Sequence, residues 1–500
     1  MKIAISRGTK IFLTGWLVYS LHFATDISRE HYPAFSLAER GTLRVDPYLG
    51  LHPDLFEVPG RGAFINNNPG ASIVGGLAYA PARPLVDLAV GAAARHRPTA
   101  DHDATYRDDR PMRREFFRRV RDRGLDVRFG LAAGVIQLLG FAPLCAAALV
   151  CMFSLLVRLG FSERQATGLA LLYGFGTPVF FRAAFLNHNL LVAHALLFAF
   201  ALLQAPGGRL ASRARLFAAG GVVGSGLLCD YAGSVPVVAL GSYTLARLRA
   251  LLPWRSALVR MLWMVAGAAL PVGGLLVYQQ WAFGNPFLPA QYYMPATQFS
   301  VEGWKGFDWP SPDLLLRNLF DRRYGFFAFG PLMALAFAAP RLARPPDAHV
   351  GRPERVLAYG LFVALLVFTS ANQFARLQWI TGFRMLAPAL PLLFLLVADS
   401  LVRLPRRLVL AIAGLAVFHS WCIAMVRADA IESVRVVLTQ GPRLPWLTSM
   451  WRAGDSYLSF LPQTGPQAWP VLLVGAVLLA WVWTRPTPAR ARGHLGSGLC

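Results

Sequence analysis

The chain alternates between long apolar runs and shorter polar connections, three of which are themselves long. A helix rises about 1.5 Å per residue, so a helix that crosses a bilayer needs about 20 apolar residues. Roughly twelve runs approach that length. The expected spans are 8–25, 129–158, 166–182, 189–205, 215–229, 232–248, 258–281, 325–340, 355–373, 384–402, 407–426 and 468–484. The pattern predicts an all-α, polytopic integral membrane protein, in which the short fifth and sixth spans tilt or form a broken hairpin.

Composition agrees with this prediction. Hydrophobic residues make up 55% of the 500 residues and charged residues only 15%, which leaves more apolar surface than a water-soluble globule can bury. Only three of the 49 basic residues are lysine, and alanine, glycine and proline are abundant, as is typical of a GC-rich bacterial genome. We therefore expect a protein of the bacterial cytoplasmic (inner) membrane.

Orientation follows from the basic residues of the short connections, which favour the cytoplasmic side. Arginines and lysines gather before the first span, at alternate connections and in the basic tail 485–500. Both termini are therefore expected in the cytoplasm, and the long segments 26–128, 282–324 and 427–467 on the outer face. We expect function there, on a catalytic core formed by 1–405, followed by C-terminal helices over 406–484.

Residues 72–94 and 95–128 complicate this topology. The first segment is apolar, and the second holds eleven arginines and seven carboxylates. If 72–94 crossed the membrane, every later loop would be inverted against its arginines unless another span were added, so we expect an interfacial or re-entrant helix. The arginine-rich stretch is expected to be either a solvated helix or a platform for lipid phosphates.

The formal net charge of +23 does not indicate nucleic-acid binding. Much of it lies in the connections, where it sets topology and contacts anionic lipids, and no zinc finger, P-loop or basic zipper accompanies it. The glycine-rich stretch 220–226 lies inside an apolar run, where small residues favour close helix packing rather than phosphate binding.

Several polar residues near the expected outer face are candidates for chemistry. Asp26 follows the first span, where partial burial of a carboxylate suits a general base, although a lone aspartate there is more often an ordinary helix end. Residues 30–40 predict a short amphipathic helix that ends at Gly41 and carries Tyr32. Further along, His188 with Asn187, and Asp230 with Tyr231, interrupt apolar regions, as functional groups or as structural partners.

A family resemblance joins these features. The aspartate after the first helix, the segments "EHYPAFSLAERGTLRVD" and "PGASIVGGLAYAP", and then "GTPVFFRAAFLNHNLLVAHALL", "LFDRRYGFFAFG" and "WITGFRMLAPALP" resemble the GT-C membrane glycosyltransferases. The similarity is to bacterial relatives of the protein mannosyltransferase and lipid A aminoarabinose transferase group. It extends over most of residues 10–400, but these relatives often carry a "DE..Y" motif, whereas Ile27 follows Asp26 here.

The resemblance implies an inverting transfer of a sugar from a polyprenyl-phosphate donor to a glycan, lipid or protein acceptor of the cell envelope. Asp26 would take the role of the base, with Glu30 as its substitute. The cations expected to hold the donor phosphate are Arg384, Arg322, Arg323 and Lys305. Alternatively, Arg384 and Arg323 anchor helix ends at the head groups. Tyr32, Asn187, His188, Asp230 and Tyr231 are the candidates for the acceptor.

No cofactor is implied, and with no DxD pair in the first loop we expect a metal-independent enzyme. The alternatives are a transporter or flippase of lipid-linked sugars, and a noncatalytic membrane assembly protein. Movement of intact lipid-linked sugar across the membrane would identify a transporter. Unchanged function after replacement of Asp26 would identify an assembly protein.

Overall fold

The computed structural model describes residues 4–95, 111–204, 210–343, 347–378, 382–452 and 467–488. Within these ranges the one sheet is an antiparallel hairpin of β1 (Leu55–Val58) and β2 (Gly62–Ile65). All other elements are helices, so the all-α prediction is confirmed. Parts of the predicted arginine-rich stretch (96–110), of the third long segment (453–466) and of the basic tail (489–500) lie outside the described residues.

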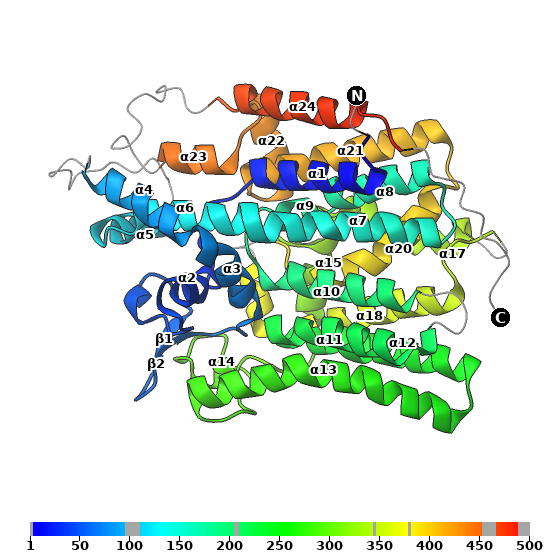
Figure 1. Ribbon diagram of the computed structural model, residues 1–500, viewed down its shortest axis with the longest axis horizontal. Coiled ribbons are helices and arrows are strands. Elements are labelled where there is room, and N and C mark those ends of the chain that lie inside the picture. Colours follow the sequence, from blue (N-terminus) through cyan, green and yellow to red (C-terminus); the bar gives the residue numbers. More distant parts are fainter. Residues whose placement is uncertain are drawn as a thin grey trace.

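Long helices lie side by side along the longest axis of the molecule (Figure 1). Every predicted span coincides with helical structure: α1 (Arg7–Leu21), α6 (Asp126–Val135) running through a π-helical turn (Ile136–Phe141) into α7 (Ala142–Arg158), α8 (Glu163–Phe175) with α9 (Val179–Arg182), α10 (His188–Leu203), α11 (Arg213–Cys229), α12 (Ser234–Leu251), α13 (Trp254–Phe283), α16 (Phe326–Phe329) with α17 (Leu335–Leu342), α18 (Arg352–Ser370), α20 (Leu390–Leu401), α21 (Arg406–Val426) and α24 (Trp469–Thr484).

Within the described ranges, five helical stretches are long and apolar enough to cross a membrane: Gly70–Arg95, Asp126–Arg158, Trp254–Phe283, Arg352–Ser370 and Arg406–Val426. Shorter apolar helices accompany them. Two predicted spans are interrupted, because the helix breaks before Pro178 between α8 and α9 and before Pro331 between α16 and α17. Proline disfavours helical backbone at the residue that precedes it. The chain is thus a polytopic helical membrane protein with broken helices in its interior.

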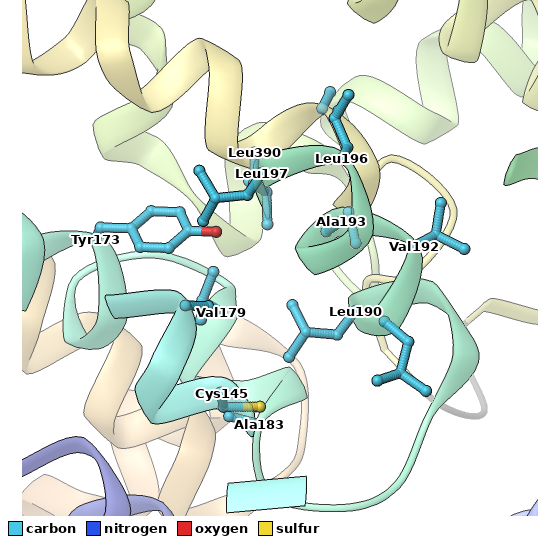
Figure 2. Packing of buried hydrophobic residues seen from close by; sticks show 14 of the residues in the cluster. Cys145, Tyr173, Val179, Ala183, Leu190, Val192, Ala193, Leu196, Leu197 and Leu390 are labelled. Carbon is cyan, nitrogen blue, oxygen red and sulfur yellow. The ribbon is translucent and has the colours of Figure 1, made fainter. Parts of the chain in front are cut away.

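Helix α10 lies at the centre of the bundle. Its sequence, HNLLVAHALLFAFALL, has no polar face, and nearly all of its residues are buried. Leu190, Ala193 and Leu197 pack among side chains that come from α7, α8, α9 and α20 (Figure 2). A helix that is apolar all round is stable only when other elements surround it.

The glycines of α11 pack directly against the backbone of α13. A Cβ atom added at Gly220 would lie 2.0 Å from the carbonyl oxygen of Met264, and one added at Gly267 would lie 2.0 Å from that of Phe217. These two helices form the most extensive pair contact of the fold. The interpretation of 220–226 as a packing surface is confirmed.

The long segment between α1 and α6 gathers at one end of the bundle, on the left in Figure 1. It contributes α2 (His31–Arg40), the β-hairpin, α3 (Gly70–Tyr79), α4 (Arg83–Arg95) and α5 (Pro111–Asp122), and the short helices α14 (Ala290–Tyr293) and α23 (Pro445–Arg452) lie at the same end. Helix α2 ends at Gly41, whose φ of 66° is left-handed, as the sequence predicts.

Residues 72–94 form most of α3 and α4. By length and composition Gly70–Arg95 could cross a membrane. In Figure 1, however, α4 lies beyond the left end of α1, at the end of the bundle, rather than alongside the long helices. The interfacial position of residues 72–94 stays a prediction.

The first and last described segments meet each other, because the backbone N–H of Ile5 donates to the carbonyl of Pro486 (2.9 Å). The proposed boundary at 405 also stays a prediction, and one hydrophobic cluster includes residues of α21 as well as of the core.

Candidate active site

Asp26 follows α1 in extended chain and is held by two arginines. One carboxylate oxygen accepts from Arg113 of α5 (2.7 Å), and the other accepts from Arg427 at the end of α21 (3.0 Å). Arg427 also stacks over the rings of Phe181 and Phe185, with centroids at 4.5 and 4.7 Å. The Asp26 side chain remains 36% exposed. The predicted base is therefore oriented by fixed guanidiniums and is reachable from outside.

Glu30 lies at the start of α2 and is almost completely buried. Its carboxylate contacts Nδ1 of His188 and accepts from the side-chain amide of Asn67 (3.2 Å), and the hydroxyl of Ser72 donates to its backbone carbonyl (2.8 Å). Burial alone would raise the pKa of this carboxyl, but the His188 imidazole and the Arg29 guanidinium lower it well below its usual value. Glu30 is therefore a buried carboxylate anion.

His188 joins two carboxylates. Its Nδ1 faces Glu30, and its Nε2 lies 2.9 Å from the carboxylate of Asp230. An imidazole satisfies two carboxylate acceptors only when both of its nitrogens carry protons. The preceding residue, Asn187, fixes the start of α10, since its side chain accepts from the N–H of Leu190 and donates to the carbonyl of Arg182. The ring is thus held in place from three separate elements.

A second ion pair lies next to this triad. Arg29 donates to Asp54 (2.9 Å) and to the side-chain oxygen of Asn66 (2.7 Å). Although burial would raise the pKa of Asp54, Arg29 lowers it. The Asn66 side chain donates to the sulfur of Met294, and this hydrogen bond joins the residue that follows α14 to the site.

Arg384 brings a partly buried cation, whose Nε is fully buried, to the same region. Its Nη2 donates to the carbonyl of Phe374 (3.4 Å), while its Nε has no hydrogen-bond partner among the described residues. The carboxylates of Glu30, Asp54 and Asp230 act on this guanidinium electrostatically, yet none of them forms an ion pair with it in the part of the chain that the structure describes. A guanidinium in this state is suited to bind an oxyanion such as phosphate.

Three other predicted residues have partners outside this cluster. Tyr32 packs in an aromatic group with Tyr48 and Phe129, and the hydroxyl of Tyr231 accepts from Gln279 (2.6 Å). Lys305 lies over the ring of Tyr292, at 5.2 Å.

Arg322 approaches Asp429 (3.8 Å), and Arg323 lines a cavity together with Arg317 and Arg376. Direct contacts therefore join Glu30, His188 and Asp230, with Arg384 in electrostatic range of both carboxylates. Among the described residues, the four predicted phosphate-binding cations share no hydrogen-bond or ion-pair partner.

Sequence reasoning missed Arg29, Asp54, Asn66 and Arg427. None of these four was singled out from the sequence, although Asn66 directly follows the apolar stretch that ends at Ile65 and Arg427 directly follows the span 407–426. Polar residues directly after an apolar run were a usable signal in both places. Among the described residues no group of three or more His, Cys, Asp or Glu side chains is arranged to hold a metal ion, and metal independence stays a prediction.

No protein-family model matches the sequence, and no curated protein sequence matches it. Among solved structures, the chain is similar to ArnT from Cupriavidus metallidurans in the apo state. The sequence identity is 16% and the TM-score is 0.45, over 94% of this chain and 70% of that one. Function therefore has to be argued from the site itself.

Proposed function

We propose that this protein is a membrane glycosyltransferase that moves a sugar from a polyprenyl-phosphate donor to an acceptor of the cell envelope. The observation that carries the proposal is the partly buried Arg384 guanidinium, which lies within electrostatic range of Glu30 and Asp230, the two carboxylates that His188 joins. A transferase of this kind needs cations for a leaving phosphate next to carboxylates that can take or orient a proton.

Arg384 is the proposed ligand of the donor phosphate. As the bond between the anomeric carbon and the phosphate oxygen breaks, negative charge grows on that phosphate, and a guanidinium already partly buried in a site of low dielectric stabilises it with little reorganisation. Arg182 lies close enough to act on Arg384 electrostatically and adds positive potential. Arg322, Arg323 and Lys305 stay predictions as donor ligands, with weaker support because their contacts are with other residues.

Asp26 is the proposed base. The acceptor hydroxyl gives its proton to Asp26 while its oxygen bonds to the anomeric carbon from the face opposite the phosphate, so the configuration inverts and the polyprenyl phosphate leaves. Exposure of the Asp26 side chain supports this choice over Glu30, which is buried and bound by His188. Glu30 remains the substitute, because its lowered pKa keeps it ionised as a base must be.

His188 and Asp230 are the proposed contacts for the acceptor, with Tyr231 beside them. The contacts of Asn187 support a structural role in capping α10, and the packing of Tyr32 supports a structural role in the aromatic core.

We place this end of the bundle on the outer face of a bacterial inner membrane, with both termini in the cytoplasm, because the long segments gather at one end while the segments at Ile5 and Pro486 meet. Metal, cofactor and nucleic acid have no role in the proposal.

The test is transfer of radiolabelled sugar from polyprenyl-phosphate donors to envelope glycans, lipids and proteins by the purified protein. Asp26→Asn is expected to lose most of the activity, and Glu57→Gln, which changes an exposed carboxylate of β1, should retain it. Full activity of Asp26→Asn with loss in Glu30→Gln would move the base to Glu30. Full activity of both variants would refute this site.

A further inference from the structure

A cavity of about 210 Å³ lies between α15 (Pro312–Phe320), the turn 321–324 and a short 3-10 helix, η7 (Gln373–Leu377). Arg317, Asp321, Arg323, Tyr324 and Arg376 line it. None of these residues belongs to the contacts described above for Glu30, His188, Asp230 or Arg384. The cavity therefore needs an explanation of its own.

The arginines of this cavity are positioned in advance. Arg317 and Arg376 both bind the carboxylate of Asp313, each at 2.8 Å, so one carboxylate orients two guanidiniums. The backbone N–H of Arg323 donates to Asp321 (2.7 Å), which fixes the turn that carries its side chain. Three guanidiniums face two carboxylates here, so an excess of positive charge surrounds the cavity.

Tyr324 provides the second, independent observation. Its side chain is 3% exposed, and it lines the cavity. Its hydroxyl makes no hydrogen bond to any residue in the described ranges. This hydroxyl is not one of the fully buried polar atoms of the described residues, so it is open to the cavity, where it can donate a hydrogen bond to water or to a ligand oxygen.

The surroundings of the cavity indicate where such a ligand comes from. Helix α15 buries Leu314 and Asn318 but exposes Leu316 (57%) and Phe320 (62%). The N–H of Ser311, just before this helix, donates to the carbonyl of Ser370, the last residue of α18. An amphipathic helix with exposed apolar side chains, at the end of a membrane-length helix, is expected at the level of the lipid head groups.

We propose that this cavity binds the phosphate group of an anionic membrane phospholipid. Arg323 and Arg317 supply charge-assisted hydrogen bonds to the phosphate oxygens, and the Tyr324 hydroxyl donates another. The acyl chains lie along Leu316 and Phe320. This proposal assigns Arg323 to a phospholipid in place of its predicted role as a donor ligand, and its test measures lipid binding alone.

The test is native mass spectrometry of the full-length protein released from detergent micelles that contain phosphatidylglycerol. Arg323→Gln and Tyr324→Phe should each retain about fivefold less of the lipid than wild type, as expected for the loss of one partly exposed, charge-assisted hydrogen bond. Arg322→Gln is the matched control, because Arg322 is the exposed neighbour that does not line the cavity. A thermal melt of each variant checks its folding, and Tyr324→Phe removes only one oxygen atom.

A second arm distinguishes a lipid from a soluble anion. With a large molar excess of inorganic phosphate in place of phosphatidylglycerol, we expect the protein to retain much less phosphate than lipid in the mass spectrometer, because the free anion lacks the acyl chains. Equal retention of phosphatidylglycerol by all four proteins would overturn the proposal. Binding of inorganic phosphate that depends on Arg323 and Tyr324, without retention of the lipid, would overturn the assignment to a lipid.

Discussion

Replacement of Gly220 by alanine tests the packing of α11 on α13. The added Cβ would lie 2.0 Å from the carbonyl oxygen of Met264 and 2.8 Å from its carbonyl carbon, both backbone atoms that cannot rotate away. Ordinary contact begins at about 3.4 Å, so the helices must separate locally by about 1.4 Å. Overpacking usually costs about 1–3 kcal/mol, and we expect the upper end, about 3 kcal/mol, because a backbone has to move.

The neighbouring Gly221 offers a matched control. A Cβ added there would lie 3.6 Å from the carbonyl oxygen of Gly267, an ordinary contact, so Gly221→Ala should change the unfolding free energy by less than about 0.5 kcal/mol. Both variants can be measured by titrating detergent-solubilised protein with sodium dodecyl sulfate and following tryptophan fluorescence. Equal stability of the two variants would refute the close approach of these helices.

Two further predictions concern buried carboxylates. Burial raises the pKa of Glu30, but His188 and Arg29 lower it well below its usual 4.5, so ionised Glu30 stabilises the fold above pH 4.5, and this contribution is lost as the pH falls through the lowered pKa. The unfolding free energy of wild type should therefore exceed that of Glu30→Gln by about 2–4 kcal/mol at pH 7, and this difference should shrink in acid. A difference that does not change with pH would contradict the ion pair. Glu354→Gln should cost about 2–3 kcal/mol in the same titration, because Glu354 is buried and accepts from Arg247 at 2.7 Å, and a change under about 0.5 kcal/mol would contradict this.

The helices of this fold were predictable because a bilayer fixes the length of an apolar run that crosses it. Two local features were also predictable from the sequence. The end of α2 at Gly41 follows from the left-handed backbone that glycine favours, and the helix-packing surface at Gly220 follows from small residues inside an apolar run. Breaks inside spans, such as the one before Pro331, were missed because apolar runs hide them.

The site was predictable only as separate residues. Glu30 and His188 are 158 positions apart, and Asp26 and Arg427 are 401 positions apart, so their contacts depend on how the helices are arranged rather than on local sequence. The same limit explains why Arg384, Arg322 and Lys305 were assigned one role. Arg384 and Arg322 lie at or near the start of a span, and Lys305 lies in the long segment 282–324, so the sequence alone does not distinguish their partners.

The central claim is that a lipid-borne phosphate is the leaving group. The most direct measurement is mass spectrometry of the donor lipid when the purified protein is incubated in liposomes with a polyprenyl-phosphate sugar and an envelope acceptor. We predict that wild type releases one free polyprenyl phosphate for each glycosylated acceptor, and that Asp26→Asn releases little. Intact donor in every reaction, or donor that crosses the bilayer without cleavage, would contradict the claim.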